Sequence, residues 1–199
     1  MDVEIVEQKI AYTGYFQIVQ YRLRHSLFHG GWSPIITREV FERGNAAAVL
    51  PYDPRRDEIV FIEQFRAGAL SAERGPWLLE IVAGTMETDE SAEAVVRRES
   101  VEEAGRELSR LVQICSYFTS PGGPSEQIHL FWGEIDGLGA GGVFGIAEEH
   151  EDIRVLVTSY EKAQQWLDAG RFNSASAIIS LQWLKLNRDY LRQLWGAVT

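Results

Sequence analysis

The stretch that decides the fold runs from Gly84 to Gly105 and reads GTMETDESAEAVVRRESVEEAG. Its second part predicts a helix over Ser91 to Ala104, because serine caps a first helical turn and Gly105 is a typical helix stop. Working outward, the runs Trp77 to Val82 and Leu111 to Thr119 on either side are rich in strand-forming residues. A strand, a loop, a helix and a second strand in this order indicate a mixed fold of strands and helices.

Carboxylates collect on one face of the predicted helix. Val95, Glu99 and Glu103 are four residues apart, so this face begins apolar and ends in acids. Glu102 adds a third acid, and Arg98 stands one turn before it, where it can hold that acid in place. Crowded carboxylates repel one another unless a cation lies between them, and such oxygen ligands suit Mg²⁺ or Mn²⁺. A solvated, charged helix face is the alternative that the helix alone leaves open.

The rest of the chain alternates strand and helix signals. Strands are predicted at 15–24, 33–41, 45–50, 58–65, 127–135 and 153–157, and helices at 158–170 and 173–195. Five glycines fall between Gly137 and Gly145, which predicts a mobile loop. We expect a small N-terminal β domain over residues 1–43 and a larger domain over residues 44–199.

Composition and charge narrow the function classes. The 199 residues are 45% hydrophobic and 24% charged, as in globular proteins. Asp and Glu number 29 against 19 Lys and Arg, and the net charge of −10 disfavours a nucleic-acid or membrane-surface partner. Cys115 is the single cysteine, which excludes an internal disulfide and a cysteine-based zinc site. No signal peptide or membrane span is visible, and we expect a cytoplasmic protein.

The spacing within the fold-deciding stretch matches a known box. Seven positions stand at the spacing of the Nudix box, namely Gly84, Glu90, Arg98, Glu99, Glu102, Glu103 and Gly105. At background frequencies of roughly 6–7% each, a chance match in any one register is on the order of 10⁻⁸. The chain therefore resembles the Nudix hydrolases, which cleave a nucleoside diphosphate linked to another moiety. Two apolar positions of the box hold Ser100 and Arg106 here, so we expect the helix to pack differently at these residues.

The resemblance implies an α+β fold. The expected architecture is an α/β/α sandwich around a mixed sheet, with a small antiparallel N-terminal sheet that is used in dimerisation. Further motifs are similar to the bacterial ADP-ribose pyrophosphatases within that family, over nearly the whole chain. They are YFQIVQYRLRH (15–25), WLLEIVAG (77–84), SPGG (120–123) and EEHEDI (148–153). Pro121, fifteen residues past the end of the box, is the marker of this subgroup.

The subgroup resemblance implies a reaction and a catalytic set. The expected reaction is hydrolysis of ADP-ribose to AMP and ribose 5-phosphate with two or three Mg²⁺ ions, or Mn²⁺ in their place. Glu99, Glu103, Glu151 and the backbone carbonyl of Ala83 would be metal ligands. Glu149 would be the general base that takes a proton from the attacking water, and a base on a mobile loop can be placed when substrate binds. A solvated acidic loop is the alternative for the segment around it.

The same resemblance implies five substrate-binding residues. Arg66 would contact the diphosphate, Glu126 the terminal ribose, and Tyr15 would stack on adenine. Arg38 and Arg43 would hold the substrate from the N-terminal domain. Ordinary sheet surface or core is the alternative for each of these residues. Because the family dimerises through its N-terminal sheet, we expect a homodimer in which the partner completes each site.

Two other functions stay open. A Nudix pyrophosphatase for a nucleotide sugar or a dinucleotide would use the same chemistry, and Pro121 is the feature that favours ADP-ribose. A non-catalytic module that senses ADP-ribose would typically lack box glutamates, but Glu99, Glu102 and Glu103 are all present. A phosphate-cradling NTPase is disfavoured, because no Gly-Lys-Ser/Thr follows the glycines at 137–145.

Overall fold

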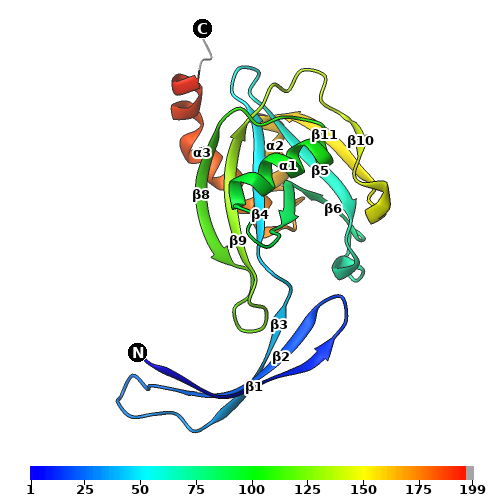
Figure 1. Cartoon of the computed structure of the whole chain (residues 1–199). Coiled ribbons are helices and arrows are strands. Elements are labelled where there is room, and N and C mark those ends of the chain that lie inside the picture. Colours follow the sequence, from blue (N-terminus) through cyan, green and yellow to red (C-terminus); the bar gives the residue numbers. More distant parts are fainter. Residues whose placement is uncertain (196–199) are drawn as a thin grey trace. The chain divides into compact units, whose positions relative to one another are not determined.

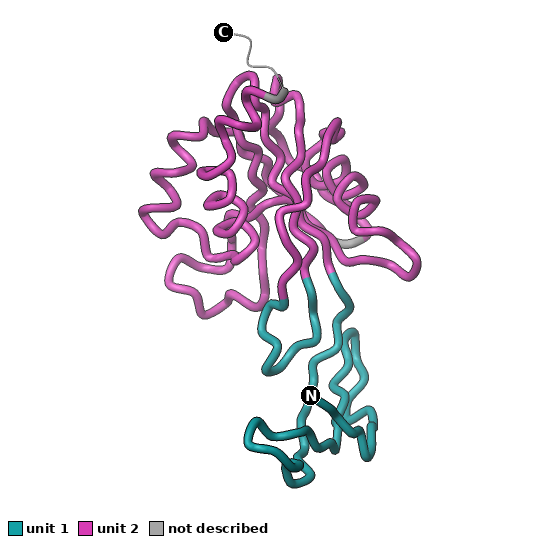
Figure 2. The backbone as a smooth tube through the Cα atoms, turned by 90° about the vertical axis from the view of Figure 1, so that its left-hand side faces the viewer, with its two compact units in different colours: residues 1–45, 118–127 teal, residues 46–117, 128–199 magenta. Residues whose placement is uncertain are grey.

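The structure, a computed structural model, describes residues 1–195, except for the side chains of Glu149, Leu194 and Trp195. The chain forms two compact units, which Figure 2 shows in different colours. Unit 1 comprises residues 1–45 and 118–127. Unit 2 comprises residues 46–117 and the chain from residue 128 onward.

Unit 1 is built on a three-stranded antiparallel sheet in the order β1-β2-β3. Its strands are β1 (Val3–Thr13), β2 (Gln17–His25) and β3 (Ile36–Glu42). Ion pairs join the first two strands, where Arg24 lies 2.6 Å from Glu4 and Arg22 lies 3.0 Å from Glu7. The sequence pattern does not predict β1, because charged residues interrupt its apolar residues and its order comes from pairing with β2.

The segment 118–127 belongs to unit 1 although it lies far from the N-terminal strands in the sequence. The backbone amide of Phe41 donates to the carbonyl of Gly123 at 3.1 Å, and the amide of Ser125 donates to the carbonyl of Phe41 at 3.1 Å. The amide of Gln127 also donates to Oδ1 of Asn45 at 3.0 Å. These bonds hold the segment beside the end of β3.

Unit 2 contains a mixed sheet of eight strands. Six of them follow the order β10-β11-β5-β4-β9-β8, while β6 pairs with β5 and β7 pairs with β4. The strands are β4 (Ala46–Asp53), β5 (Glu58–Phe65), β6 (Trp77–Glu80), β7 (Val82–Thr85), β8 (Leu111–Phe118), β9 (Gln127–Glu134), β10 (Gly142–Phe144) and β11 (Ile153–Ser159). β4 runs parallel to β9 and antiparallel to β5 and β7, which makes the sheet mixed.

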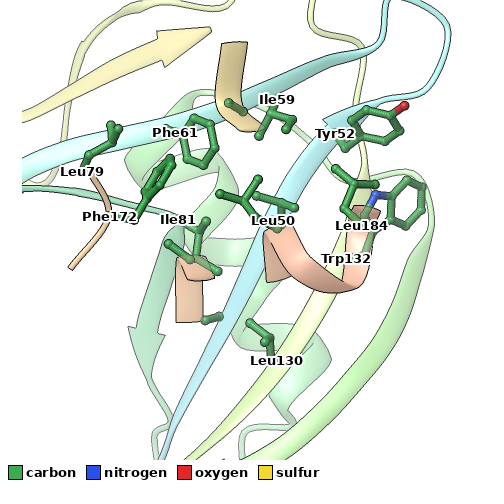
Figure 3. Packing of buried hydrophobic residues seen from close by; sticks show 14 of the residues in the cluster. Leu50, Tyr52, Ile59, Phe61, Leu79, Ile81, Leu130, Trp132, Phe172 and Leu184 are labelled. Carbon is green, nitrogen blue, oxygen red and sulfur yellow. The ribbon is translucent and has the colours of Figure 1, made fainter. Parts of the chain in front are cut away.

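Helices cover both faces of this sheet (Figure 1). They are α1 (Ala92–Ala104), α2 (Tyr160–Asp168) and α3 (Ala175–Trp195), and short 3₁₀ turns lie at Ala67–Ala69 and Ala147–Glu149. Successive residues of β4 belong to two different hydrophobic cores, one on each face of the sheet. Val49 packs with Val95 of α1 in the first core, whereas Leu50 packs with Leu184 of α3 in the second core. Figure 3 shows Leu50 and Leu184 within the second core, together with Phe61 of β5. The α/β/α sandwich predicted from the sequence is confirmed.

The helix that carries the box has the predicted ends. Oγ of Ser91 accepts a hydrogen bond from the amide of Ala94 at 3.2 Å, and Gly105 ends the helix with a left-handed φ of 61°. The glycine-rich segment differs from the predicted loop, since it contains β10, a three-residue strand that pairs with the edge strand β11. Among the described residues, no helix is both long and apolar enough to cross a membrane.

A buried ion cluster anchors α3 to the turn between β4 and β5. Asp57 has a left-handed φ of 58° and accepts a hydrogen bond from the hydroxyl of Tyr52 at 2.5 Å. Arg188 of α3 donates to it through Nε at 2.8 Å, and Arg192 lies 3.2 Å away. Burial raises the pKa of Asp57, but hydrogen bonds from Arg188 and Tyr52 outweigh burial and hold that pKa below its usual value.

Candidate active site

Glu99 lies against β7 because a glycine stands opposite it. A Cβ atom on Gly84 would overlap the Glu99 carboxylate and would lie 2.5 Å from its Cγ. Gly84 belongs to β7 and Glu99 to the third turn of α1, and these two elements pack against each other. The box glycine is therefore required for space, since any side chain there would push the Glu99 carboxylate away.

Glu103 is buried one turn further along the same face. Its side chain is 2% exposed, and its Oε2 accepts a hydrogen bond from the amide of Ala83 at 2.9 Å. Its Oε1 accepts a longer hydrogen bond from Nε2 of Gln64 at 3.4 Å. The sequence reasoning missed Gln64, although a polar residue within the apolar run of β5 was a usable signal.

Arg98 organises the acids around the helix. Its Nη1 lies 2.7 Å from Oε1 of Glu99 and 2.9 Å from Oε2 of Glu102, and its Nε lies 3.1 Å from Oε1 of Glu90. Three carboxylates thus share one guanidinium, which fixes their direction but leaves the site with an excess of negative charge. Glu90 was not among the predicted site residues except as a box position, and it serves here to hold Arg98.

The electrostatics of the two inner acids fit a bound cation. Burial raises the pKa of Glu103 to about 8, and the charge of Glu99 adds to this effect. Burial also raises the pKa of Glu99 to about 7, against the opposing charge of Arg98. Burial makes the charged form of both carboxylates unfavourable. A divalent cation bound to their hard oxygen atoms would offset this free-energy cost. The donor set therefore fits Mg²⁺ or Mn²⁺.

Glu151 lies in the chain between the 3₁₀ turn Ala147–Glu149 and β11. Its charge contributes to the raised pKa of both Glu99 and Glu103. Its Oε2 accepts a hydrogen bond from the amide of Ile146 at 3.1 Å, and a Cβ atom on Gly145 would lie 2.6 Å from the Cβ of Glu151. Among the described side chains, no three of the types His, Cys, Asp and Glu already stand together as a metal cluster.

Glu149, the predicted general base, is one of the three residues of the 3₁₀ turn Ala147–Glu149. Its side chain lies outside the described residues. Arg66 follows β5, where its Nε lies 2.8 Å from Oε2 of Glu80. Its positive charge lowers the pKa of Glu103, so Arg66 acts electrostatically on an acid of the site.

The other four predicted residues lie in unit 1. Tyr15 is 95% exposed, and its ring meets the ring of Phe16 edge to face with centroids 4.7 Å apart. Arg43 lies over the ring of Phe16, with its Cζ atom 5.5 Å from the ring centroid. The Nε atom of Arg43 lies 3.4 Å from Oε1 of Glu126. Arg38 donates through Nη1 to the carbonyl of Thr37. Phe16, which the sequence reasoning missed, connects Tyr15 with the pair of Arg43 and Glu126.

The mixed sheet between helices, with acids converging beside a glycine, defines a family. The model of the NUDIX domain matches residues 42–178, which is well over half of the chain, and the chain belongs to this family. It is 48% identical over 195 residues to the ADP-ribose pyrophosphatase of Escherichia coli (strain K12), covering 98% of this chain and 93% of that protein.

Two further comparisons identify a more distant relative and a similar solved structure. The chain is 33% identical over 189 residues to the GDP-mannose pyrophosphatase of Cronobacter sakazakii (strain ATCC BAA-894), covering 94% of this chain and 96% of that protein. A solved structure described as "Crystal structure of ADP compounds hydrolase" has a TM-score of 0.69 at 17% identity. That match covers 94% of this chain and 96% of the solved chain, and it supports the fold.

Proposed function

We propose that this protein hydrolyses the pyrophosphate bond of ADP-ribose to AMP and ribose 5-phosphate with divalent cations. The observation that carries the proposal is the pair of carboxylates of partly buried Glu99 and buried Glu103, opposite Gly84 and Ala83. The similarity to a curated ADP-ribose pyrophosphatase over 98% of the chain supports ADP-ribose as the proposed substrate. Mg²⁺ is the proposed cation, because the available donors are hard oxygen atoms.

The residues of the site have separate roles in the proposed reaction. Divalent ions at the site would neutralise phosphate oxygens and lower the pKa of the attacking water. Glu99 and Glu103, with the carbonyl of Ala83 and with Glu151, would hold these ions, while Arg66 binds the diphosphate through its planar fork of donors. The water oxygen forms a bond to phosphorus as the bond to the bridging oxygen breaks. Glu149 takes the proton of the water, and AMP and ribose 5-phosphate leave.

Substrate recognition is proposed to involve unit 1. Tyr15 offers an exposed ring on which adenine can stack, and Arg43 lies over the ring of Phe16 beside it. Arg38 would supply a further positive charge from β3. Glu126 would accept hydrogen bonds from the hydroxyl groups of the terminal ribose. In this proposal residues 1–43 form a domain for dimerisation and substrate contacts, and residues 44–199 form the hydrolase domain.

A homodimer formed through the N-terminal sheet is part of the proposal, and the cytoplasm is its proposed location. Three apolar side chains of β1, those of Val3, Ile5 and Ile10, are more than half exposed, and a partner sheet would cover them. Ile5→Arg should convert a dimer into a monomer in sedimentation equilibrium. A wild-type protein that sediments as one chain would contradict the dimer.

Another nucleoside diphosphate derivative is the second candidate substrate. The GDP-mannose pyrophosphatase at 33% identity supports this alternative, and the lower identity makes it the weaker one. A sensing module without catalysis is disfavoured, because Glu99, Glu102 and Glu103 are present and converge with Arg98.

A hydrolysis panel tests the proposal. ADP-ribose, ADP-glucose, GDP-mannose, NADH and a diadenosine polyphosphate are offered with Mg²⁺ and with EDTA, and the products are identified. We expect the highest kcat/KM for ADP-ribose, with AMP and ribose 5-phosphate formed only when Mg²⁺ is present. Glu149→Gln should lower kcat and leave metal binding intact, whereas the matched variant Glu148→Gln should behave like wild type. Preference for another substrate would move the proposal to the second candidate.

A further inference from the structure

Arg106 follows the glycine that ends the box helix, at a position where an apolar residue was expected. Its Nη2 donates a hydrogen bond to the carbonyl of Leu138 at 3.1 Å. The same nitrogen would lie 3.7 Å from a Cβ atom on Gly139, so the guanidinium follows the backbone of the glycine-rich segment, residues 136–146. The Leu138 side chain is 68% exposed, and its burial therefore cannot be what holds the segment here.

Two further contacts join this segment to the last turn of α1. The ring of Phe144 occupies the space beside Gly105, where a Cβ atom would lie 2.8 Å from its Cζ. The amide of Gly145 donates to the carbonyl of Glu102 at 3.2 Å. The glycine-rich segment, which lies between β9 and β11 and includes β10 (Figure 1), is thus fastened to residues 102–106 at Leu138 and at its end.

The start of the segment is fixed independently of α1. The amide of Gly137 donates to Oδ2 of Asp53 at 2.9 Å, and the amide of Leu138 donates to Oδ1 of Asp136 at 3.0 Å. Between Gly137 and β10, the hydrogen bond from Arg106 to the carbonyl of Leu138 joins the backbone to a residue outside the segment. Glycine-rich backbone loses more conformational entropy on ordering than other sequences, so a single anchoring donor has a large effect there.

The end of the segment at Gly145, which bonds to Glu102 rather than to Arg106, precedes acids of the candidate active site. Gly145 contacts Glu151, and Ile146 donates to the Glu151 carboxylate. We propose that Arg106 is a positioning residue, which fastens Leu138 of the glycine-rich segment to the end of the box helix and, together with the contacts of Phe144 and Gly145, fixes the approach of Glu151 to the acids of α1. The inference rests on the proposed function, because it assigns Arg106 an effect on that reaction.

A simpler role would be packing, with the aliphatic part of Arg106 filling the expected apolar position. Arg106→Leu separates the two roles, because leucine retains apolar volume and removes the donors. Arg106→Lys keeps one positive donor group, and its behaviour should lie between that of wild type and that of Arg106→Leu. Arg74→Leu is the matched control, since Arg74 is an exposed arginine in the loop before β6.

Hydrogen exchange of the metal-free protein, read by mass spectrometry, gives the primary result without any turnover. Arg106→Leu should raise exchange of residues 137–146 about tenfold and leave the midpoint of thermal unfolding unchanged. In Mg²⁺ with ADP-ribose, kcat should fall about fivefold with KM unchanged, the equivalent of about 1 kcal/mol. Arg106→Lys should recover part of both effects, and Arg74→Leu should show neither.

Three results would overturn the inference. They are unchanged exchange of the segment in Arg106→Leu, faster exchange with an unchanged kcat, and faster exchange spread over the whole of unit 2 with a lower melting temperature. The last pattern would establish a packing role. If wild type does not hydrolyse ADP-ribose, the proposed function fails by itself, while the exchange measurement still decides whether Arg106 anchors the segment.

Discussion

Glu103→Gln should affect stability and metal binding in opposite directions. Glutamine keeps the shape of the side chain and an oxygen that can accept the hydrogen bond from Ala83, but it carries no charge. The pKa of Glu103 is raised in the folded protein to about 8 from an ordinary 4.5, so folding favours its protonated form. The contribution of Glu103 to the free energy of unfolding is fully present below pH 4.5 and is lost as the pH rises through 8. The glutamine variant has no such loss.

The magnitude follows from the two pKa values. At about 1.4 kcal/mol for each pH unit, the gap between 4.5 and about 8 corresponds to roughly 4 kcal/mol at pH 8. Glu99 shares the repulsion, so the pair titrates together and part of this free energy belongs to Glu99. We expect metal-free Glu103→Gln to exceed wild type by about 2–4 kcal/mol in free energy of unfolding at pH 8, and to equal it near pH 4.

Urea unfolding in EDTA at several pH values measures the first effect, and calorimetric titration with Mg²⁺ measures the second. We expect the variant to bind Mg²⁺ at least about tenfold more weakly, because a charged ligand is lost. Glu107→Gln, at an exposed glutamate just after α1, is the matched control and should change neither quantity. A metal-free Glu103→Gln that is less stable than wild type at pH 8, or one with unchanged Mg²⁺ affinity, would refute the reasoning.

Three other substitutions test separate parts of the molecule. Gly84→Ala should weaken Mg²⁺ binding about tenfold and lower the free energy of unfolding by about 1–3 kcal/mol, because the methyl group displaces the Glu99 carboxylate; unchanged calorimetric affinity would argue against that overlap. Asp57→Asn tolerates the left-handed φ but removes the buried carboxylate that Arg188 binds most closely, so urea unfolding should reveal a loss of about 2–3 kcal/mol, and a loss below about 0.5 kcal/mol would show that the pair is immaterial. Phe16→Leu should raise KM for ADP-ribose about threefold to tenfold with kcat unchanged, as expected for a ring that supports substrate contacts, and a lower kcat at constant KM would contradict this role.

The sequence predicted the elements whose patterns are local. The helix of residues 92–104 was defined by the cap at Ser91, the stop at Gly105 and the spacing of its acids, all within one stretch of chain. Strand β5 was predicted with its observed bounds, because alternation and the turn before it mark both ends. The α/β/α architecture followed from the family resemblance that this stretch carries, and it is confirmed.

Features that depend on contacts between distant residues could not be predicted in this way. The segment 118–127 joins unit 1 through backbone bonds to Phe41, and nothing in the composition of either segment indicates that pairing. Strand β10 forms within a run of glycines because β11 offers an edge. Gln64 contacts Glu103 and Phe16 contacts Arg43, and in both cases the partner lies far away in the sequence, so these contacts exist only in the folded chain.

A crystal structure with Mg²⁺ and a non-hydrolysable analogue of ADP-ribose tests the central claim most directly. We predict ions with about 2.0–2.1 Å between metal and oxygen at the carboxylates of Glu99 and Glu103, each ion also contacting a diphosphate oxygen of the analogue. Carboxylates that keep their present partners, with no ion beside them while the analogue is bound elsewhere, would contradict the claim.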